Sequence, residues 1–279
     1  MLVKIHFFFI KYARFPDNLS LFYDIIETNT HKKSKEVPML HFLATLIRKL
    51  LKLVMALVLL VCVAALTICG VSGYAVYHEA TANRPLEQAA LEVQQKPGYT
   101  TLDQVPQIFL NAVVATEDHR FYDHHGFDVI GTGRALMRNA LSGELQEGGS
   151  TISQQLARTL YYEQTRSLSR KIAELITSVQ LERTFSKEQI LELYINSIYY
   201  GDGYYCIGDA SWGYFGVAPA GMTNGQATLL AGVPNAPSVY SPTVNYDLSR
   251  QRQEQVLTRM VDAGYLDEET ATAIYNEGI

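Results

Sequence analysis

Residues 169–201 read SRKIAELITSVQLERTFSKEQILELYINSIYYG. In the first half of this stretch, four apolar residues recur at the spacing i, i+3, i+4 and i+7, namely Ile172, Leu175, Ile176 and Val179. This spacing is typical of the buried stripe of an amphipathic helix. Ser186 and Gln189 then form a capping-box pattern, which predicts a second helix that stops at Gly201. We expect a mainly α fold, because alternating strand patterns are scarce in the chain.

The polar residues of the first helix occupy a different face. Arg170, Glu174 and Ser178 are spaced four residues apart, so we expect Glu174 on the non-buried side together with Arg170 and Lys171. For an isolated helix the ordinary interpretation is a solvated Arg170–Glu174 ion pair, which contributes only a few tenths of a kcal/mol.

Upstream, Pro106 precedes the apolar run QIFLNAVVATED, which predicts a helix that ends near Glu117 and Asp118. Thr101 and Gln104 resemble a capping box ahead of it. The segment GGSTISQQLARTLYY (148–162) then begins with glycines and continues with uncharged hydrogen-bonding groups. A glycine loop that opens a helix can bind phosphate through backbone N–H groups. Four nearby cations strengthen that interpretation: Arg158, Arg166, Arg170 and Lys171.

Downstream, prolines at 234, 237 and 242 are expected to end a short apolar helix and impose an extended segment. The last 32 residues predict a helical hairpin, with Gly264 at the end of its first helix.

A stretch without any charge runs from Leu53 to Tyr77. At about 1.5 Å per residue, a helix of this length crosses a hydrocarbon layer of about 30 Å. The alternatives are a buried core helix and a cleaved signal peptide. Lysines and arginines precede the stretch and only His78 and Glu79 follow it, so the positive-inside rule places the N-terminus in the cytoplasm and the rest outside.

The predicted organisation has four parts. They are a cytoplasmic N-terminal segment (1–52), a transmembrane helix (53–77), a stalk (78–98) that could be helical near 86–93, and a folded domain (99–279). Met39 would open a shorter anchored protein.

Charge and cysteine content exclude some classes of protein. Net charge is −5 overall, and residues 78–279 carry fourteen Lys and Arg against twenty-four Asp and Glu. An acidic domain argues against nucleic acid as the main partner, because phosphate binding needs a basic face. Three cysteines, two of them in the apolar stretch, do not form a disulfide framework.

Four segments in order resemble one family. ATEDHRFYDHHG (115–126) resembles the E-D-x-x-F-x-x-H-x-G motif of the peptidoglycan glycosyltransferases of glycosyltransferase family 51, a domain shared by bifunctional penicillin-binding proteins and monofunctional transglycosylases. GGSTISQQL, RKIAE and KEQILELYINSIYYG resemble the three motifs that follow, and the match runs from about Tyr99 to Pro242. The resemblance implies a lysozyme-like, two-lobed helical domain whose smaller lobe dips into the membrane.

The resemblance also implies an activity: polymerisation of lipid II into glycan strands by inverting transfer, which forms β-1,4 bonds and releases undecaprenyl diphosphate. Glu117 matches the general base and Glu174 the second carboxylate, which would order cations or a metal around the leaving diphosphate. Residues implied at the substrate are Asp118, Phe121, His124, Ser150, Thr151, Gln154, Gln155, Arg158, Arg166, Arg170 and Lys171. The sequence predicts no metal ligands in the protein and identifies no cofactor with certainty. The candidate cofactor is a divalent cation, Mg or Mn, at the diphosphate. A metal cluster of His119, His124 and His125 is the disfavoured alternative.

Implied partners are lipid II, the lipid-linked glycan strand, the cytoplasmic membrane and other cell-wall synthases, with no nucleic acid. We expect a single-pass protein of the cell membrane with its catalytic domain extracytoplasmic. No S-x-x-K tetrad occurs, so we expect the monofunctional form without a transpeptidase domain. Rival functions are a lytic murein hydrolase on a related fold and a non-catalytic cell-wall scaffold.

The sequence departs from the family pattern at a few positions. Arg158 stands where Lys is usual, Cys206 and Gly208 replace a glycine and a glutamate, and Val217 replaces a Lys. The functional interpretation depends on Glu117 and Glu174 facing one groove, in which arginines neutralise the leaving diphosphate.

Overall fold

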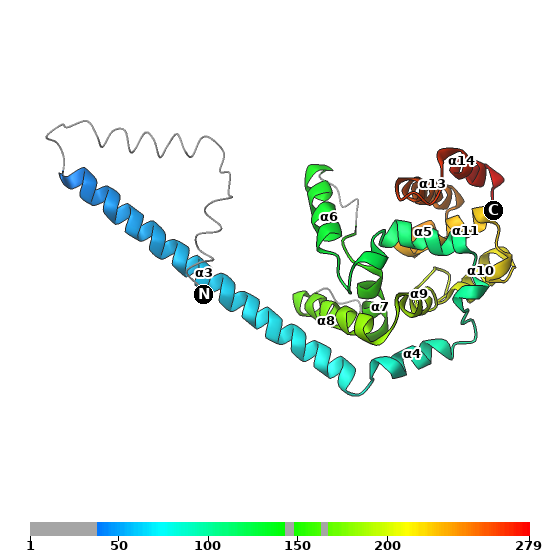
Figure 1. The fold of residues 1–279 in the computed structure, drawn as a ribbon, viewed down its shortest axis with the longest axis horizontal. Coiled ribbons are helices and arrows are strands. Elements are labelled where there is room, and N and C mark those ends of the chain that lie inside the picture. The colour runs from blue at the N-terminus through cyan, green and yellow to red at the C-terminus, as the bar shows by residue number, and fades with distance from the viewer. Residues whose placement is uncertain (1–37, 143–147, 163–166) are drawn as a thin grey trace. The chain divides into compact units, whose positions relative to one another are not determined.

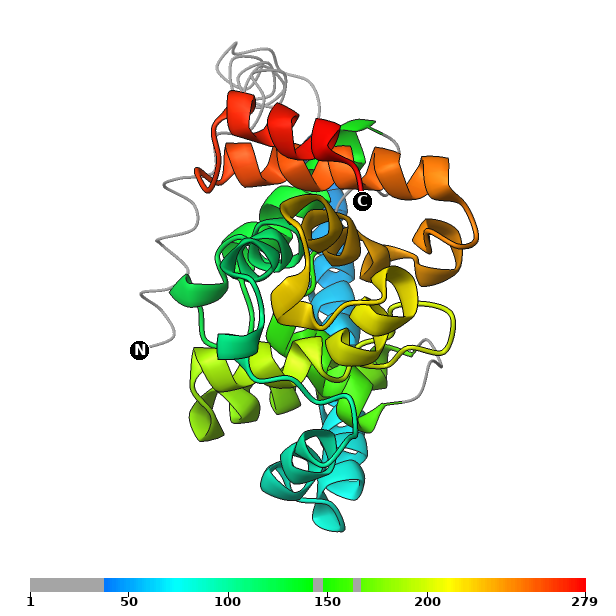
Figure 2. The ribbon, with the colours of Figure 1, turned by 90° about the vertical axis from the view of Figure 1, so that its right-hand side faces the viewer.

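The computed structural model describes residues 38–142, 148–162 and 167–279. The chain divides into two compact units, one ending at Val63 and the other running from Ala64 to Ile279. Every functional residue predicted above belongs to the second unit, whose helices are shown from two directions in Figures 1 and 2.

The first long helix, α3, spans Pro38–Ala82 and is 45 residues long. Its segment His41–Ala82 is long and apolar enough to cross a membrane, and none of its most apolar window is buried. This exposure argues against a soluble core helix. The helix extends past both ends of the predicted span 53–77, because no helix breaker occurs before Pro85. The predicted stalk therefore begins as helix.

The rest of the second unit is a set of shorter helices. In chain order they are α4 (Leu86–Gln94), α5 (Gln107–Glu117), α6 (Val129–Ser142), α7 (Ile152–Tyr161), α8 (Leu168–Thr184), α9 (Lys187–Ile195), α10 (Ile207–Phe215), α11 (Asn224–Gly232), α12 (Pro237–Tyr240), α13 (Tyr246–Asp262) and α14 (Glu268–Glu277). The described residues contain no strand, so the mainly α prediction is confirmed.

Two groups of helices form the core. α5 packs against α11 and α13, and α7 packs against α8 and α9. α5 is apolar on almost every side, and most of its residues are buried, including Phe109 and Val113. Figure 2 shows α13 and α14 running alongside each other as the predicted hairpin, with Gly264 at a φ of 77° just beyond α13. The end of α5 is therefore held inside the unit by two other helices.

The buried side of α8 differs from the prediction. The residues fully inside are Ala173, Glu174, Thr177, Ser178 and Leu181, whereas the apolar stripe at 172, 175, 176 and 179 is only half-buried. The polar side packs against α7 and α9, which supply partners for its hydrogen bonds. Ile172 instead meets α3 at Gly73, where a Cβ on the glycine would lie 2.5 Å from the Ile172 side chain.

The predicted helix ends have mixed outcomes. The capping box of Ser186 and Gln189 is confirmed, and a second one joins Thr151 and Gln154 at the start of α7. The box predicted at Thr101 is wrong: residues 102–104 form a 3₁₀ turn without a side-chain cap, and α5 begins after Pro106. The extended segment predicted after Pro234 is also wrong, because Pro234 and Pro237 lie in the first turns of short helices, where proline fits well.

Candidate active site

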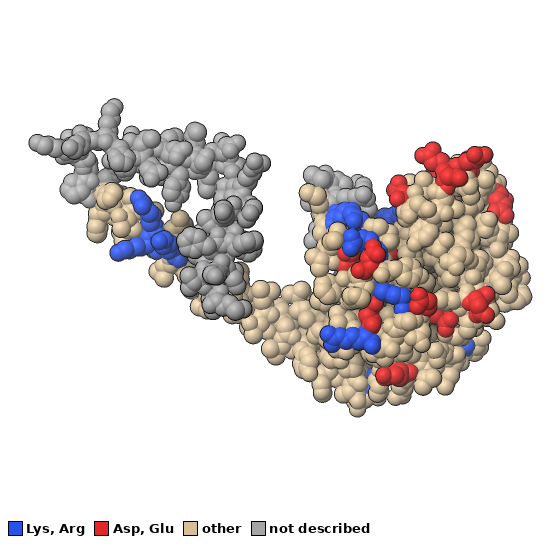
Figure 3. All heavy atoms as spheres, in the orientation of Figure 1, with Lys and Arg blue, Asp and Glu red and all other residues tan. Residues whose placement is uncertain are grey.

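A cavity of about 370 Å³ lies where the end of α5 meets α6, the loop before α7, and α13. Glu117, His119, Arg134, Ser150, Thr151 and Arg259 are among the residues that line it. The expectation that Glu117 and Glu174 face one groove is not met at this cavity, because Glu117 lines it and Glu174 does not. On the face of the second unit shown in Figure 3, basic and acidic side chains are interspersed. The cations near the cavity are therefore a local feature of an acidic domain.

Glu117 is the last residue of α5, and its two carboxylate oxygens have different surroundings. Oε2 accepts a hydrogen bond of 2.9 Å from Nε2 of Gln155. Oε1 is buried and has no hydrogen-bond partner among the residues that the structure describes. The Gln155 amide is fixed in turn, because Tyr194 donates its hydroxyl proton to Oε1 of Gln155 at 3.1 Å. Burial raises the pKa of Tyr194 well above its ordinary value, so this hydroxyl remains a donor.

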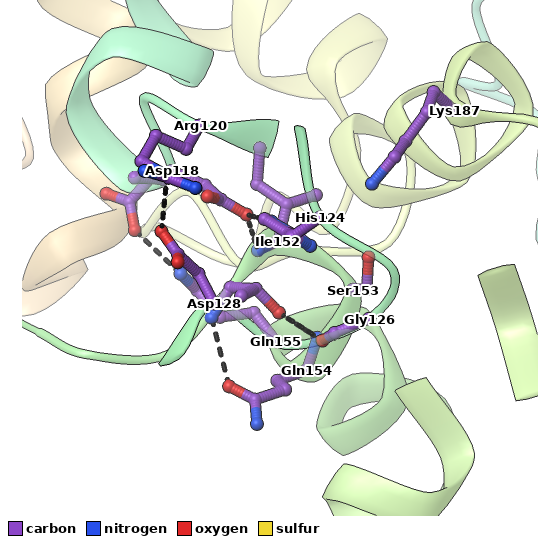
Figure 4. Close-up of polar contacts among 12 residues, drawn as sticks. Asp118, Arg120, His124, Gly126, Asp128, Ile152, Ser153, Gln154, Gln155 and Lys187 are labelled. Atoms are coloured by element: carbon purple, nitrogen blue, oxygen red, sulfur yellow. Dashed lines mark hydrogen bonds and ion pairs between the residues drawn. The ribbon is translucent and has the colours of Figure 1, made fainter. Parts of the chain in front are cut away.

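Asp118 ties the first motif to the second. Its Oδ2 accepts hydrogen bonds from the backbone N–H of Ile152 (3.0 Å) and lies 2.9 Å from Nε2 of His124 (Figure 4). Thr151 donates to the carbonyl of Gly126 at 2.8 Å. Asp118 and His124 are both buried; Asp118 contributes to the cavity lining, whereas His124 lies behind it in the loop. Asp118 thus fixes the N-terminus of α7, and with it Gln155.

Gly126 allows this loop to pass close to α8. Its φ is 94°, and a Cβ there would lie 2.8 Å from the backbone nitrogen of Val179. A side chain at this position would meet backbone atoms and also require an unfavourable conformation.

Glu182 joins three helices behind this loop, and the sequence analysis did not single it out. Its Oε1 accepts from Ser153 of α7 (2.5 Å) and Lys187 of α9 (2.7 Å), and lies 3.9 Å from Nδ1 of His124. The ammonium group of Lys187 also lies 4.4 Å from the ring centre of Phe121, which is fully buried. The signal was present in the sequence, because Glu182 continues the four-residue spacing of Glu174 and Ser178.

Glu174 is 2 % exposed, so its predicted place on the solvent side of α8 is wrong. Nε of Arg170 lies 3.1 Å from Oε1 of Glu174, and Nζ of Lys171 lies 3.2 Å from its Oε2. Lys171 also donates to Oγ of Ser150 at 2.7 Å. Glu174 is therefore linked to the cavity through Lys171 and Ser150, and it orders two cations beside the glycine-containing loop.

The remaining predicted substrate residues occupy different places. Ser150 and Thr151 line the cavity, Gln155 holds Glu117, and Gln154 is buried in the α7 capping box. Arg158 is exposed on α7, and Arg166 lies outside the described residues. The structure thus brings the first four residues of the second motif, 148–151, to the cavity and assigns Gln154 to the helix start.

The predicted site omitted further charged groups that line the cavity or lie in its wall. Arg134 donates to Nε2 of His119 at 2.7 Å. Burial is the larger cause, and the charge of Arg134 the next, of a lowered pKa of His119, which favours the neutral ring. Asp128 pairs with Arg120 at 3.2 Å. Burial alone would raise the pKa of Asp128, but the backbone N–H groups of residues 131 and 130 and the Arg120 charge outweigh it and lower that pKa.

The fourth motif supports the segment before α5. Asn196 exchanges two hydrogen bonds with the backbone of Thr100 (2.9 and 2.7 Å), and Glu192 accepts from the backbone N–H of Leu102 at 3.0 Å. Two departures from the family pattern have a local explanation. Cys206 caps α10, and burial raises the pKa of its thiol to about 11. Gly208 lies so close to Gly98 that a Cβ would be 2.2 Å from its carbonyl oxygen.

The expected Mg or Mn at the diphosphate stays a prediction. Among the described residues, no three His, Cys, Asp or Glu side chains come together, and each carboxylate oxygen of Glu174 faces a cation. These residues do not form a carboxylate site for a divalent ion.

Comparison with known proteins decides the family. The model of the transglycosylase family matches residues 83–261, well over half of the chain. The chain belongs to the transglycosylase family. The resemblance carried by the four motifs is thereby confirmed.

Members of this family with similar sequences include penicillin-binding protein 1A from Neisseria flavescens, 41% identical over 62% of this chain and 22% of that protein. Penicillin-binding protein 1A from Escherichia coli strain K12 is also 41% identical, over 64% of this chain and 21% of that protein. The chain therefore spans less than a quarter of these relatives. A protein from Cupriavidus necator that is provisionally named a transglycosylase is 42% identical over 66% of this chain and 80% of its own length.

Proposed function

We propose that this chain is a peptidoglycan glycosyltransferase that extends glycan strands from lipid II. The observation that carries the proposal is the state of Glu117 at the cavity: one oxygen is held by Gln155, while the other is buried and has no partner within the described part of the chain. A carboxylate that has one oxygen fixed and the other available to accept a proton suits a general base. The family assignment and the cation set around Glu174 support the same reaction.

In this proposal, Oε1 of Glu117 accepts the proton of the 4-hydroxyl of the acceptor N-acetylglucosamine. The oxygen of that 4-hydroxyl attacks C1 of the donor N-acetylmuramic acid as the bond from C1 to the diphosphate oxygen breaks. The α-linked donor becomes a β-1,4 bond, and undecaprenyl diphosphate leaves with the bonding electron pair. Arg170 and Lys171, ordered by Glu174, stabilise the charge of the leaving group.

The membrane location of the substrate fits two apolar features of the chain. The 41–82 segment can anchor the chain in the bilayer, and the positive-inside rule then puts the catalytic unit on the outer side. Phe127, Val129, Ile130 and Met137, in or just before α6, expose large apolar side chains, while other residues of α6 line the cavity. We propose that these side chains enter the outer leaflet beside the lipid-linked substrate, and that other cell-wall synthases act on the same strands.

The test incubates the full chain with labelled lipid II, with and without moenomycin. Wild-type protein is expected to form polymer that moenomycin blocks, and Glu117→Gln is expected to lower the rate by about 10² to 10⁴ while donor binding persists. Glu254→Gln, an identical change at an exposed position of α13, serves as the control. Substantial polymerisation by Glu117→Gln would remove Glu117 from its role.

The same preparations separate the two rival functions. A lytic hydrolase would release soluble fragments from isolated sacculi and form no polymer. A scaffold would do neither. Oε1 of Glu117, which lacks a partner among the described residues, and the cation cluster at Glu174 favour the synthase over the scaffold, because a scaffold does not need an acid fixed in a cavity.

A further inference from the structure

The C-terminal hairpin reaches the candidate active site through α13. This helix packs against α5 and α11, and it bears Arg252 and Arg259 seven residues apart, on one face. Arg259 lines the same cavity as Glu117. Arg252 is buried and directed at α11, where it donates to the carbonyl of Gly232. Arg259 is therefore the guanidinium that α13 brings to the cavity.

Arg259 binds the helix end that carries Glu117. Its NH1 donates to the carbonyl oxygen of Thr116 at 3.0 Å, across 143 positions of sequence. Because α5 ends at Glu117, the last carbonyls of that helix have no donor within the helix. A guanidinium at this end supplies one and also interacts favourably with the negative end of the helix dipole.

We propose that Arg259 is a positioning residue for Glu117, and that the α13–α14 hairpin is thus part of the active centre. This inference rests on the proposed function. The position of Glu117 is held at two points: Gln155 fixes its carboxylate from α7, and Arg259 binds the carbonyl of the preceding residue, Thr116, from α13. The second contact sets where the unpartnered oxygen lies in the cavity. Without the contact from Arg259, the carboxylate of Glu117 stays in the cavity, but its oxygen is no longer aligned with the substrate.

The experiment compares Arg259→Ala with Arg250→Ala in the full chain. Arg250 lies on the same helix and also donates to a helix-end carbonyl, that of Tyr275, but it is not at the cavity. We expect Arg259→Ala to lower kcat by about tenfold to a hundredfold with KM for lipid II unchanged, since misplacement by about 1 Å can cost about a hundredfold in rate. Arg250→Ala should retain the wild-type kcat. Added guanidinium ion, which can enter the open cavity, should restore activity to Arg259→Ala and leave Glu117→Gln inactive.

Three results would overturn the inference. They are a kcat for Arg259→Ala within twofold of wild type, a rise in KM at unchanged kcat, and an equal loss in Arg250→Ala. If Arg259→Ala does not fold, Arg259→Lys decides, because it keeps the charge and one donor. It should retain more than a third of the wild-type kcat, and a folded Arg259→Lys protein with less than a tenth would reject the positioning role. Polymer formation by wild-type protein in the same assay separates these outcomes from failure of the proposed function.

Discussion

At the scale of single residues, the amide of Gln155 has a hydrogen bond at each end beside Glu117. It accepts from Tyr194 and donates to Glu117, so the tyrosine hydroxyl decides which end of the amide faces the acid. We expect Gln155→Leu to lower kcat for lipid II polymerisation by about tenfold or more, since the acid loses its only hydrogen bond within the described residues. Gln251→Leu, at an exposed position of α13, is the matched control. An unchanged kcat in Gln155→Leu would show that the amide does not orient the acid.

Asp128 gives a prediction about pH. Its pKa in the folded protein lies below the ordinary value of 3.8, so folding is favoured by its ionised form. That contribution is fully present above the ordinary pKa and is lost as pH falls through the lower folded value. Thermal melts from pH 7 to pH 3 should show a steeper loss of Tm below about pH 4 in wild type than in Asp128→Asn. Parallel curves for the two proteins would contradict this assignment.

At the scale of helices, Glu182 connects α7, α8 and α9 through one buried carboxylate oxygen. Replacing it by glutamine removes the charge that Lys187 and Ser153 bind, while the side-chain size is kept. We expect Glu182→Gln to lower the free energy of unfolding by about 1.5–3 kcal/mol, the usual range for hydrogen bonds to charged groups. Urea titration measures this change. Glu188→Gln, at an exposed position of α9, should be nearly neutral, and equal losses in both variants would argue against a special role for Glu182.

The helices also show which features local sequence can predict. The Ser186 capping box and the end of α5 at Glu117 follow from residues within a few positions of each other, and both predictions are confirmed. The prediction of which face of α8 is buried was wrong, because α7 and α9 offer hydrogen-bond partners to its polar side. These contacts come from other parts of the chain. Arg259 was missed for the same reason, since 143 positions separate it from Thr116.

At the scale of the whole molecule, the chain exposes apolar side chains on α3 and, within the second unit, on α6. Large exposed apolar patches on a folded protein mark interaction surfaces. Val129 and Ile130 are 69% and 58% exposed at the start of α6, the helix that also lines the cavity. If the substrate is the lipid-linked one proposed above, the bilayer that holds it would also bury the apolar side chains that the fold leaves exposed beside the cavity.

The α6 surface can be tested separately from the anchor. We expect the double variant Val129→Ser and Ile130→Ser to polymerise lipid II severalfold more slowly in vesicles, because each buried side chain of this size contributes about 1.5–3 kcal/mol in an apolar medium. In detergent with a short-chain lipid II, its rate should match wild type. Serine avoids a new charge beside Asp128, and Val239→Ser with Val244→Ser changes two other exposed valines as a control. An equal loss in vesicles and detergent would mean that the change damages the cavity itself, through Thr132 and Arg134 on the same helix, and not membrane contact.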